Sequence, residues 1–123
     1  MNKKKYLLLI AFIIAIDQIL KSFTHFKVRN YGASFDILEN QTLVLIIFSS
    51  VALMVFLYLF FKTKENKLAM SFLIAGTSSN LIDRLLLGYI IDYIQLPYLF
   101  TFNIADLVNF LGIIILVKDL WRK

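Results

Sequence analysis

The sequence predicts an all-α integral membrane protein with four transmembrane helices and both termini in the cytoplasm. Its composition, its four long apolar runs and the placement of its lysines and arginines lead to this prediction. Of the 123 residues, 60% are hydrophobic and 17% are charged, whereas soluble domains are about 45–50% apolar and about 25% charged. The composition therefore excludes an ordinary soluble domain, and the length fits one domain.

The four apolar runs define the expected membrane spans. The hydrocarbon core of a bilayer is about 30 Å thick, which takes about 20 residues of helix, and helices satisfy their own backbone hydrogen bonds in lipid. The expected spans are residues 6–23, 43–61, 68–90 and 98–117 of a single membrane domain over 1–123. Short outer loops join them, and apolar and basic residues alternate at 26–29, which favours a small β or surface-lying segment.

The runs differ in their polar content. The first follows Lys3–Lys5 as a secretory signal would, but no small-x-small cleavage site follows it. Asp17 and Lys21 continue its helical spacing, so it is expected to be a retained span. The second run has no charged residue. The third and fourth runs enclose polar residues: Asn80, Asp83, Arg84, Asn103 and Asp106.

The basic residues orient the spans. Nine of them lie at the termini or between the second and third runs: Lys3, Lys4, Lys5, Lys62, Lys64, Lys67, Lys118, Arg122 and Lys123. The opposite loops carry only Lys27 and Arg29. The excess of positive charge on cytoplasmic loops places both termini in the cytoplasm. The net charge of +5 is thus explained by topology, and nucleic acid is not an expected partner.

The sequence also narrows the chemistry of any site. It has no cysteine, and His25 is its one histidine. This composition excludes disulfides, thiolate nucleophiles and most zinc sites. No metal and no cofactor are therefore expected.

The charged residues inside the spans are expected to face the protein interior. A charged side chain that faces lipid at mid-membrane costs about 2.5–3.5 kcal/mol. Asp17 and Lys21 are four residues apart, and Asn103 and Asp106 are three apart, so each pair shares one helix face. Purely structural roles for these residues also remain open: an intrahelical ion pair in the first run, an interfacial anchor at Asp83–Arg84 and a helix N-cap at Asn103.

Two carboxylates are predicted to lie at the same depth near the outer surface. Asp92 follows the third run, and Asp106 lies one or two turns inside the fourth. Two carboxyl groups a few ångströms apart share a proton, because both cannot ionise cheaply. The ionised member can act as a general base on water while the protonated one polarises a carbonyl. This chemistry needs neither a nucleophilic side chain nor a metal.

Five short blocks follow one another along the chain: Asp17-x-x-x-Lys21, Asn30–Phe35, Asn80–Arg84, Gly88–Tyr93 and Phe102–Asp106. Their order resembles that of the bacterial lipoprotein signal peptidases, or type II signal peptidases, a family of four-helix aspartic proteases with cytoplasmic termini. The resemblance runs from Asp17 to Asp106 and skips the second run. It implies a multi-pass protein of the bacterial cytoplasmic (inner) membrane.

The resemblance also implies roles for particular residues. Asp92 and Asp106 match the catalytic aspartates of the family. Nine residues match positions that support the dyad or bind substrate: Asp17, Lys21, Asn30, Gly32, Asn80, Asp83, Arg84, Asn103 and Ala105. The asparagines of the third and fourth runs, with Arg84, are expected to orient the dyad or the substrate backbone. The other charged residues would hold the polar centre together, and the two first-loop residues would place that loop over the site.

The implied activity is removal of the signal peptide from prolipoproteins whose lipobox cysteine carries diacylglycerol, by cleavage just before that cysteine. The implied partners are these prolipoproteins and membrane lipid, and the chain is expected to act as a monomer. The family block Gly-Gly-x-x-Gly-Asn ends here in Gly76-Thr-Ser-Ser-Asn80, so that Ser79 stands in place of its last glycine. Ile91 and Tyr93 replace commoner Val or Phe, and the outer loops are short. These departures leave both aspartates in place and put substrate range in doubt.

Other functions remain open from the sequence. A non-catalytic assembly or accessory protein would tolerate Asp92→Asn and Asp106→Asn without loss of function. A divergent paralogue with a restricted substrate also remains open, and it would still need both aspartates. A small proton-coupled transporter would need a polar path to the cytoplasmic side. A serine–lysine protease would use Lys21 with Ser22 or Ser34, and its activity would depend on the serine.

Overall fold

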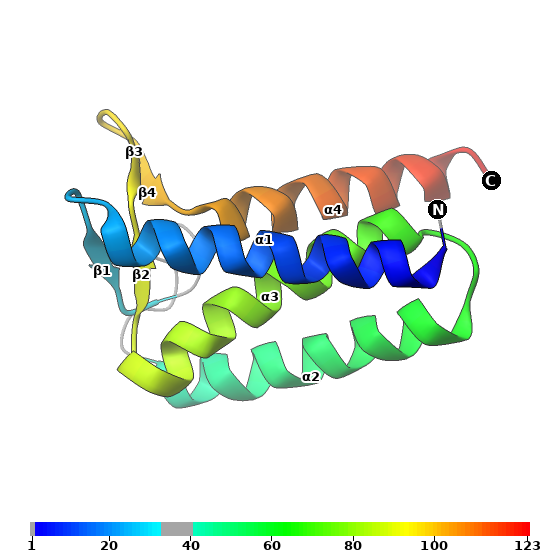
Figure 1. The fold of residues 1–123 in the computed structure, drawn as a ribbon, viewed down its shortest axis with the longest axis horizontal. Coiled ribbons are helices and arrows are strands. Elements are labelled where there is room, and N and C mark those ends of the chain that lie inside the picture. Colours follow the sequence, from blue (N-terminus) through cyan, green and yellow to red (C-terminus); the bar gives the residue numbers. More distant parts are fainter. Residues whose placement is uncertain (1, 33–40) are drawn as a thin grey trace.

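The computed structural model describes residues 2–32 and 41–123. Its helices are α1 (Lys3–Phe23), α2 (Thr42–Lys62), α3 (Lys67–Leu87) and α4 (Ile104–Trp121), and its short strands are β1 (Val28–Asn30), β2 (Ile90–Asp92), β3 (Ile94–Leu96) and β4 (Phe100–Phe102). The predicted helical class is confirmed. Figure 1 shows the strands at one end of the helices, and both termini with the α2–α3 connection at the other.

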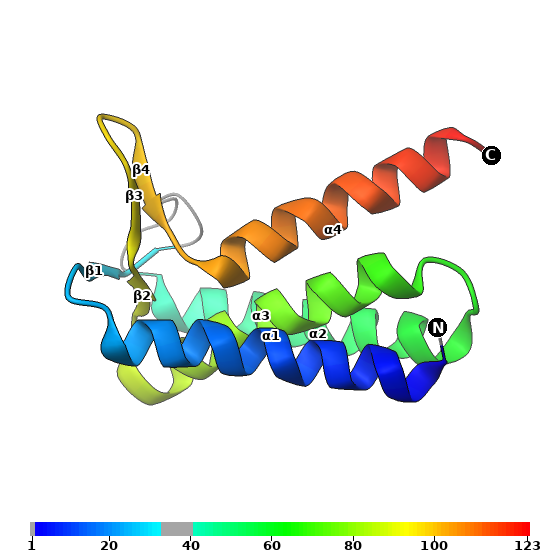
Figure 2. The same cartoon turned by 45° about the horizontal axis from the view of Figure 1, so that its top comes forward.

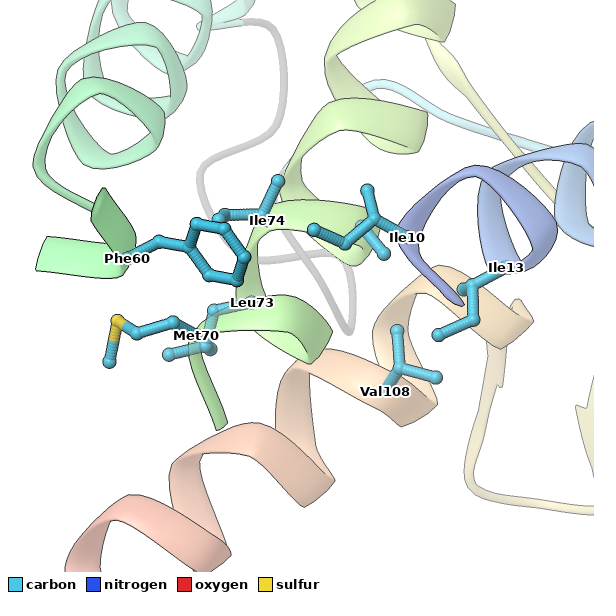
Figure 3. Packing of buried hydrophobic residues seen from close by; sticks show 8 residues of the cluster. Ile10, Ile13, Phe60, Met70, Leu73, Ile74 and Val108 are labelled. Carbon is cyan, nitrogen blue, oxygen red and sulfur yellow. The ribbon is translucent and has the colours of Figure 1, made fainter. Parts of the chain in front are cut away.

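Helix α3 is the centre of the bundle, because it packs against the other three helices. The hydrophobic core contains side chains from every helix: Ile10 and Ile13 of α1, Phe60 of α2, Met70, Leu73, Ile74 and Ala75 of α3, and Val108 of α4. Figure 3 shows these side chains converging between the helices. This apolar cluster leaves the strand end of the bundle to be packed by polar side chains.

Among the described residues, two helices are long and apolar enough to cross a membrane by length and composition, α1 and α2. Most of the apolar surface of α2 is exposed, including Phe48 at 69%, Met54 at 62% and Tyr58 at 62%. An exposed apolar surface of this extent is unusual for a soluble monomer and fits contact with lipid.

The strands form two antiparallel pairs. β1 pairs with β2, with Val28 opposite Asp92 and Asn30 opposite Ile90. β3 pairs with β4 in a hairpin, with Ile94 opposite Phe102. Figure 2 shows this hairpin projecting beyond the start of α4. The expected small β segment in the first outer loop is thus confirmed by β1.

The bounds of the last two apolar runs differ from the expected spans. The third helix ends at Leu87, where Gly88 takes a left-handed conformation (φ 83°), and α4 begins only at Ile104 because Asn103 caps it. Residues 100–102, expected inside the fourth span, form β4. Hydropathy alone does not separate an apolar strand from an adjoining apolar helix, so the two merged into one run.

Close packing of α3 on α4 depends on Gly76. A Cβ at this position would lie 2.4 Å from the carbonyl oxygen of Ala105 and 2.4 Å from Oδ1 of Asn109. We expect Gly76→Ala to lower the free energy of unfolding by about 1–3 kcal/mol, because the helices must move apart. Thermal unfolding in detergent measures this change in stability. Leu86→Ala, at a side chain 78% exposed on the same helix, should change stability little, and equal stability of both variants would contradict the prediction.

Candidate active site

A cluster of buried polar side chains fills the strand end of the bundle. All the sequence-predicted site residues within it are buried: Asp17, Lys21, Asn30, Gly32, Asn80, Asp83, Arg84, Asp92, Asn103, Ala105 and Asp106. They come from α1, α3, α4, β1 and β2 and from the residues next to them. The structure therefore brings together residues that are up to 89 positions apart (17 to 106).

Asn103 joins the two carboxylates that were predicted to pair. Its Nδ2 donates to Oδ1 of Asp92 at 3.2 Å, and its backbone N–H donates to Oδ2 of Asp106 at 3.2 Å. Asp92 is the last residue of β2, and Asp106 lies in the first turn of α4. One residue thus holds both carboxylates where a strand end meets a helix start.

The same residues form the N-cap of α4. The Asn103 side chain accepts from the backbone N–H of Asp106 at 2.8 Å, which completes a reciprocal capping box. The positive end of the helix dipole favours a negative charge on Asp106. The structural interpretation of Asn103 as an N-cap is therefore correct, and the capping residue also contacts Asp92.

Polar groups also surround each carboxylate from other elements. Asn80 Nδ2 of α3 donates to Oδ1 of Asp106 at 3.0 Å. Asn30 Nδ2 of β1 and the Thr101 hydroxyl of β4 each donate to Oδ2 of Asp92, both at 3.2 Å. Asp92 is fully buried, and Asp106 is 5% exposed. These donors restrict the orientation of both carboxylates.

Asp106 also lines an apolar cavity. The cavity has a volume of about 450 Å³, and its other walls are Leu96, Phe100, Phe102, Leu107 and Phe110. The carboxylate therefore lies at the boundary between a polar cluster and an apolar space. An apolar polypeptide segment in this cavity would have its backbone next to Asp106.

An ion-pair cluster lies directly behind the dyad. Lys21 Nζ is 2.7 Å from Asp17 Oδ2 and 2.9 Å from Asp83 Oδ2, and it donates to Oδ1 of Asn80 at 3.2 Å. Asn80 in turn accepts from Asn103 Nδ2 at 3.0 Å. The intrahelical pair of Asp17 with Lys21 is thus real, but Lys21 also links α1 to α3 and to the dyad.

Arg84 links the cluster to α2 and to Gly32 of the α1–α2 connection. Its Nη1 donates to Ser49 Oγ of α2 at 2.9 Å, and its Nη2 approaches the Gly32 carbonyl oxygen at 3.5 Å. The Gly32 N–H donates to Oδ1 of Asn30 at 2.9 Å. Arg84 is thus connected through Gly32 to Asn30, which contacts Asp92. Both Asp83 and Arg84 are buried, so they contact the protein interior rather than serve only as an interfacial anchor.

Several contributors to the cluster were not singled out from the sequence: Gln18, Ser49, Ser79, Tyr93 and Thr101. Gln18 Nε2 donates to Ser79 and to Asp83 Oδ1, and Ser79 Oγ donates to Asp17 at 2.6 Å. Ser79 replaces a glycine of the family block. Its hydroxyl makes hydrogen bonds within the cluster. The only sequence signal for Gln18 and Ser79 was that each is polar and adjoins a predicted site residue, Asp17 and Asn80 respectively.

Tyr93 ties the strands to two helices. Its hydroxyl donates to Asp17 Oδ1 at 2.5 Å and accepts from the backbone N–H of Ile104 at 3.0 Å. Burial, and then the hydrogen bond to Asp17, raise the pKa of Tyr93, so the phenol stays protonated and remains a donor.

We expect Tyr93→Phe to lower the free energy of unfolding by about 1–3 kcal/mol, because buried Asp17 loses a donor and the Ile104 N–H loses its acceptor. Chemical denaturation in detergent measures the change. Tyr98→Phe removes the same hydroxyl from a fully exposed side chain and should have almost no effect. A Tyr93→Phe protein as stable as the parent would show that this hydroxyl is not structural.

Two buried carboxylates held by one residue are the arrangement that paired-carboxylate chemistry requires. In the described part of the chain, no three histidine, cysteine or acidic side chains gather so as to hold a metal ion. The serine–lysine pairing is not supported, because Lys21 is held by two carboxylates and the exposed Ser22 donates to the Gln18 carbonyl oxygen. Ser34 lies outside the described residues.

Comparison with known proteins agrees with this site. The family model described as signal peptidase (SPase) II matches residues 5–122. A lipoprotein signal peptidase of Caldanaerobacter subterraneus is 33% identical over 89% of this chain and 91% of that protein. One of Buchnera aphidicola is 39% identical over 76% of this chain and 67% of that protein.

Solved structures share the fold. A bacterial membrane enzyme solved at 2.3 Å superposes with a TM-score of 0.88 at 27% identity, over 98% of this chain and 89% of that one. A second, solved at 1.9 Å, gives 0.81 at 27% identity, over 96% and 93%. The family match spans both aspartates and every element of the bundle. This chain belongs to the signal peptidase II family.

Proposed function

We propose that this protein is an intramembrane aspartic endopeptidase that removes signal peptides from diacylglyceryl-modified prolipoproteins by cleaving before the lipid-modified cysteine. Membership of the signal peptidase II family supports this function. The observation that carries the catalytic assignment is the joint attachment of Asp92 and Asp106 to Asn103. Asp92 and Asp106 are the catalytic residues of the proposal.

The proposed mechanism uses the dyad as one unit. Its ionised carboxylate takes a proton from a water molecule, whose oxygen attacks the carbonyl carbon of the scissile peptide bond. The protonated carboxyl donates to the carbonyl oxygen as the tetrahedral intermediate forms. Collapse of the intermediate breaks the C–N bond. The carboxyl group that took the proton from water gives it to the departing amine of the modified cysteine, and the hydroxyl formed from the carbonyl oxygen returns its proton to the other aspartate. In this mechanism one proton is shared between the two carboxyl groups, so neither aspartate is assigned as its permanent holder.

The supporting residues fall into two groups in this proposal. Asn80 and Asn103 orient the dyad, because their amides donate directly to its carboxylates. Asp17, Lys21 and Asp83 stabilise the polar centre behind it. Asn30, Gly32, Arg84 and Ala105 complete the site through the first outer loop and the start of α4.

We further propose that all four helices span the cytoplasmic (inner) membrane as one domain, with both termini inside. The basic residues at the end opposite the strands support this orientation, as does the exposed apolar surface of α2. The dyad then lies near the outer leaflet, where the diacylglyceryl chains of a prolipoprotein hold the scissile bond at a fixed depth. The signal peptide enters sideways between helices, at little cost in an apolar solvent. The enzyme acts as a monomer, with lipid and prolipoprotein as its partners.

A cleavage assay tests the proposed function. The purified protein in detergent is incubated with a lipobox peptide that carries a diacylglyceryl cysteine, and product masses locate the cut. Cleavage immediately before the modified cysteine is expected, and the same peptide without the lipid should be cut far more slowly. Lack of cleavage by folded protein across several lipobox sequences would instead favour a non-catalytic or restricted-substrate paralogue.

A further inference from the structure

A second, basic cavity lies at the end of the bundle opposite the dyad. Its volume is about 510 Å³, and four lysines from three helices and their connection line it: Lys3 of α1, Lys62 of α2, Lys64 of the α2–α3 connection and Lys67 of α3. Figure 1 shows the N-terminus and the α2–α3 connection at this same end. The cavity takes no part in the proposed peptidase site.

The charge of this cavity is not balanced by its walls. None of its described lining residues is acidic, and Glu65 of the same connection pairs with Lys123 of the C-terminus. Four ammonium groups at one small cavity repel each other, so a bound anion is favoured there. The cavity is therefore electrostatically suited to a phosphate group.

Two of the lysines are positioned by aromatic side chains of α2. Lys3 Nζ lies 5.3 Å from the ring centroid of Phe61, and Lys67 Nζ lies 4.4 Å from that of Phe60. Lys67 also donates to the carbonyl oxygen of Phe60. Cation–π contacts of this kind hold an ammonium group without neutralising its charge.

An apolar groove continues from the basic cavity. This groove, about 360 Å³ in volume, is lined by Leu57, Tyr58, Phe61 and Lys62, and it shares Phe61 and Lys62 with the cavity. Tyr58 and Phe61 are 62% and 53% exposed. Positive charge at one end and an apolar groove along an exposed helix match a phosphate headgroup with its acyl chain.

We propose that this cavity binds the headgroup phosphate of an anionic phospholipid of the cytoplasmic leaflet, with an acyl chain in the adjoining groove of α2. Anionic lipids attract clusters of lysines at the cytoplasmic surface of membrane proteins. The site rests on the proposed membrane orientation and is independent of the peptidase activity. A lipid bound here ties the start of α1 to the α2–α3 connection.

Lipid binding to the full-length protein in detergent tests the proposal. Phosphatidylglycerol and phosphatidylcholine are titrated separately, and bound lipid is counted by native mass spectrometry. Phosphatidylglycerol should bind at least about tenfold more tightly, and the double variant Lys62→Gln, Lys64→Gln should weaken that binding at least about fivefold. Lys4→Gln with Lys5→Gln removes the same charge from α1 outside the cavity and should change binding less than about twofold.

Three results would overturn the proposal: equal affinity for the two lipids, equal loss in both double variants, or inorganic phosphate displacing phosphatidylglycerol at concentrations that indicate a free-anion site. Lys62→Arg with Lys64→Arg keeps the charge and should keep the binding, which separates loss of the site from loss of the fold. Cleavage of the lipobox peptide in detergent should be unchanged in every lysine variant. Failure of lipid binding is thus distinguishable from failure of the proposed function.

Discussion

Asp92→Asn and Asp106→Asn are each expected to reduce cleavage of the diacylglyceryl lipobox peptide by at least about 10²–10⁴-fold, the usual contribution of general acid–base catalysis. An amide cannot take a proton from water, and it cannot share a proton with the remaining carboxylate. The asparagine keeps one acceptor oxygen and places its NH2 group against the donors of the other: in Asp92 the two oxygens accept from Asn103 and from Asn30 with Thr101, and in Asp106 from Asn80 and from Asn103. The loss of catalysis should appear in kcat, and the folding of each variant is measured separately.

The measurement is the rate of product formation by purified variants, followed by mass spectrometry. Asp119→Asn makes the same chemical change on α4, at the end of the helix away from the dyad, and should leave the rate unchanged. Circular dichroism and thermal unfolding establish that each variant is folded. Full activity in either dyad variant would contradict the assignment of the catalytic pair, even if the protein proves to be a peptidase.

Lys21→Met is expected to cause a larger loss of stability than either Gly76→Ala or Tyr93→Phe. Lys21 is 1% exposed and is the counter-ion of both Asp17 and Asp83. Methionine nearly matches the length of the lysine stem, so the main change is two buried carboxylates without their cation. Removing one partner from a buried ion pair typically costs about 3–5 kcal/mol.

Chemical denaturation in detergent measures this loss. Lys27→Met, at an exposed lysine of the first outer loop, removes the same charge and should change stability by less than about 0.5 kcal/mol. Adding Asp83→Asn to Lys21→Met should restore part of the lost stability, because one uncompensated charge is removed. A Lys21→Met protein as stable as the parent would mean that the aspartates become neutral or hydrated without cost.

The contacts of Lys21 show that residue spacing predicts contacts within one helix but not contacts between helices. The interval of four residues between Asp17 and Lys21 predicted their ion pair, because residues so spaced meet on one helix face. No interval in the sequence places Lys21 next to Asp83, 62 residues later (21 to 83). That contact depends on how α1 crosses α3, which side-chain packing of the two helices sets.

The hairpin before α4 shows that hydropathy did not distinguish a strand from the helix that follows it. The apolar run from residue 98 was expected to be helical throughout, yet residues 100–102 are strand β4. Strand and helix here have similar hydropathy, and the boundary is set by the cap at Asn103 and by pairing with β3. Thr101 reaches Asp92 only because of that strand, so its role was not predictable from its place in the sequence.

The sequence by itself determined the helical class, the family, the gathering of polar residues toward one end and the choice of the two aspartates proposed to pair. These follow from local properties: apolar runs, helical spacing and short motifs in a fixed order. Only the tertiary structure decided that Asn103 contacts both aspartates, through its side chain and its backbone N–H, that Arg84 contacts α2 and the α1–α2 connection, and that Ser79, Tyr93 and Thr101 belong to the cluster. The physical reason is that hydrogen bonds between elements depend on packing across the bundle, which residue type and spacing within one element do not specify.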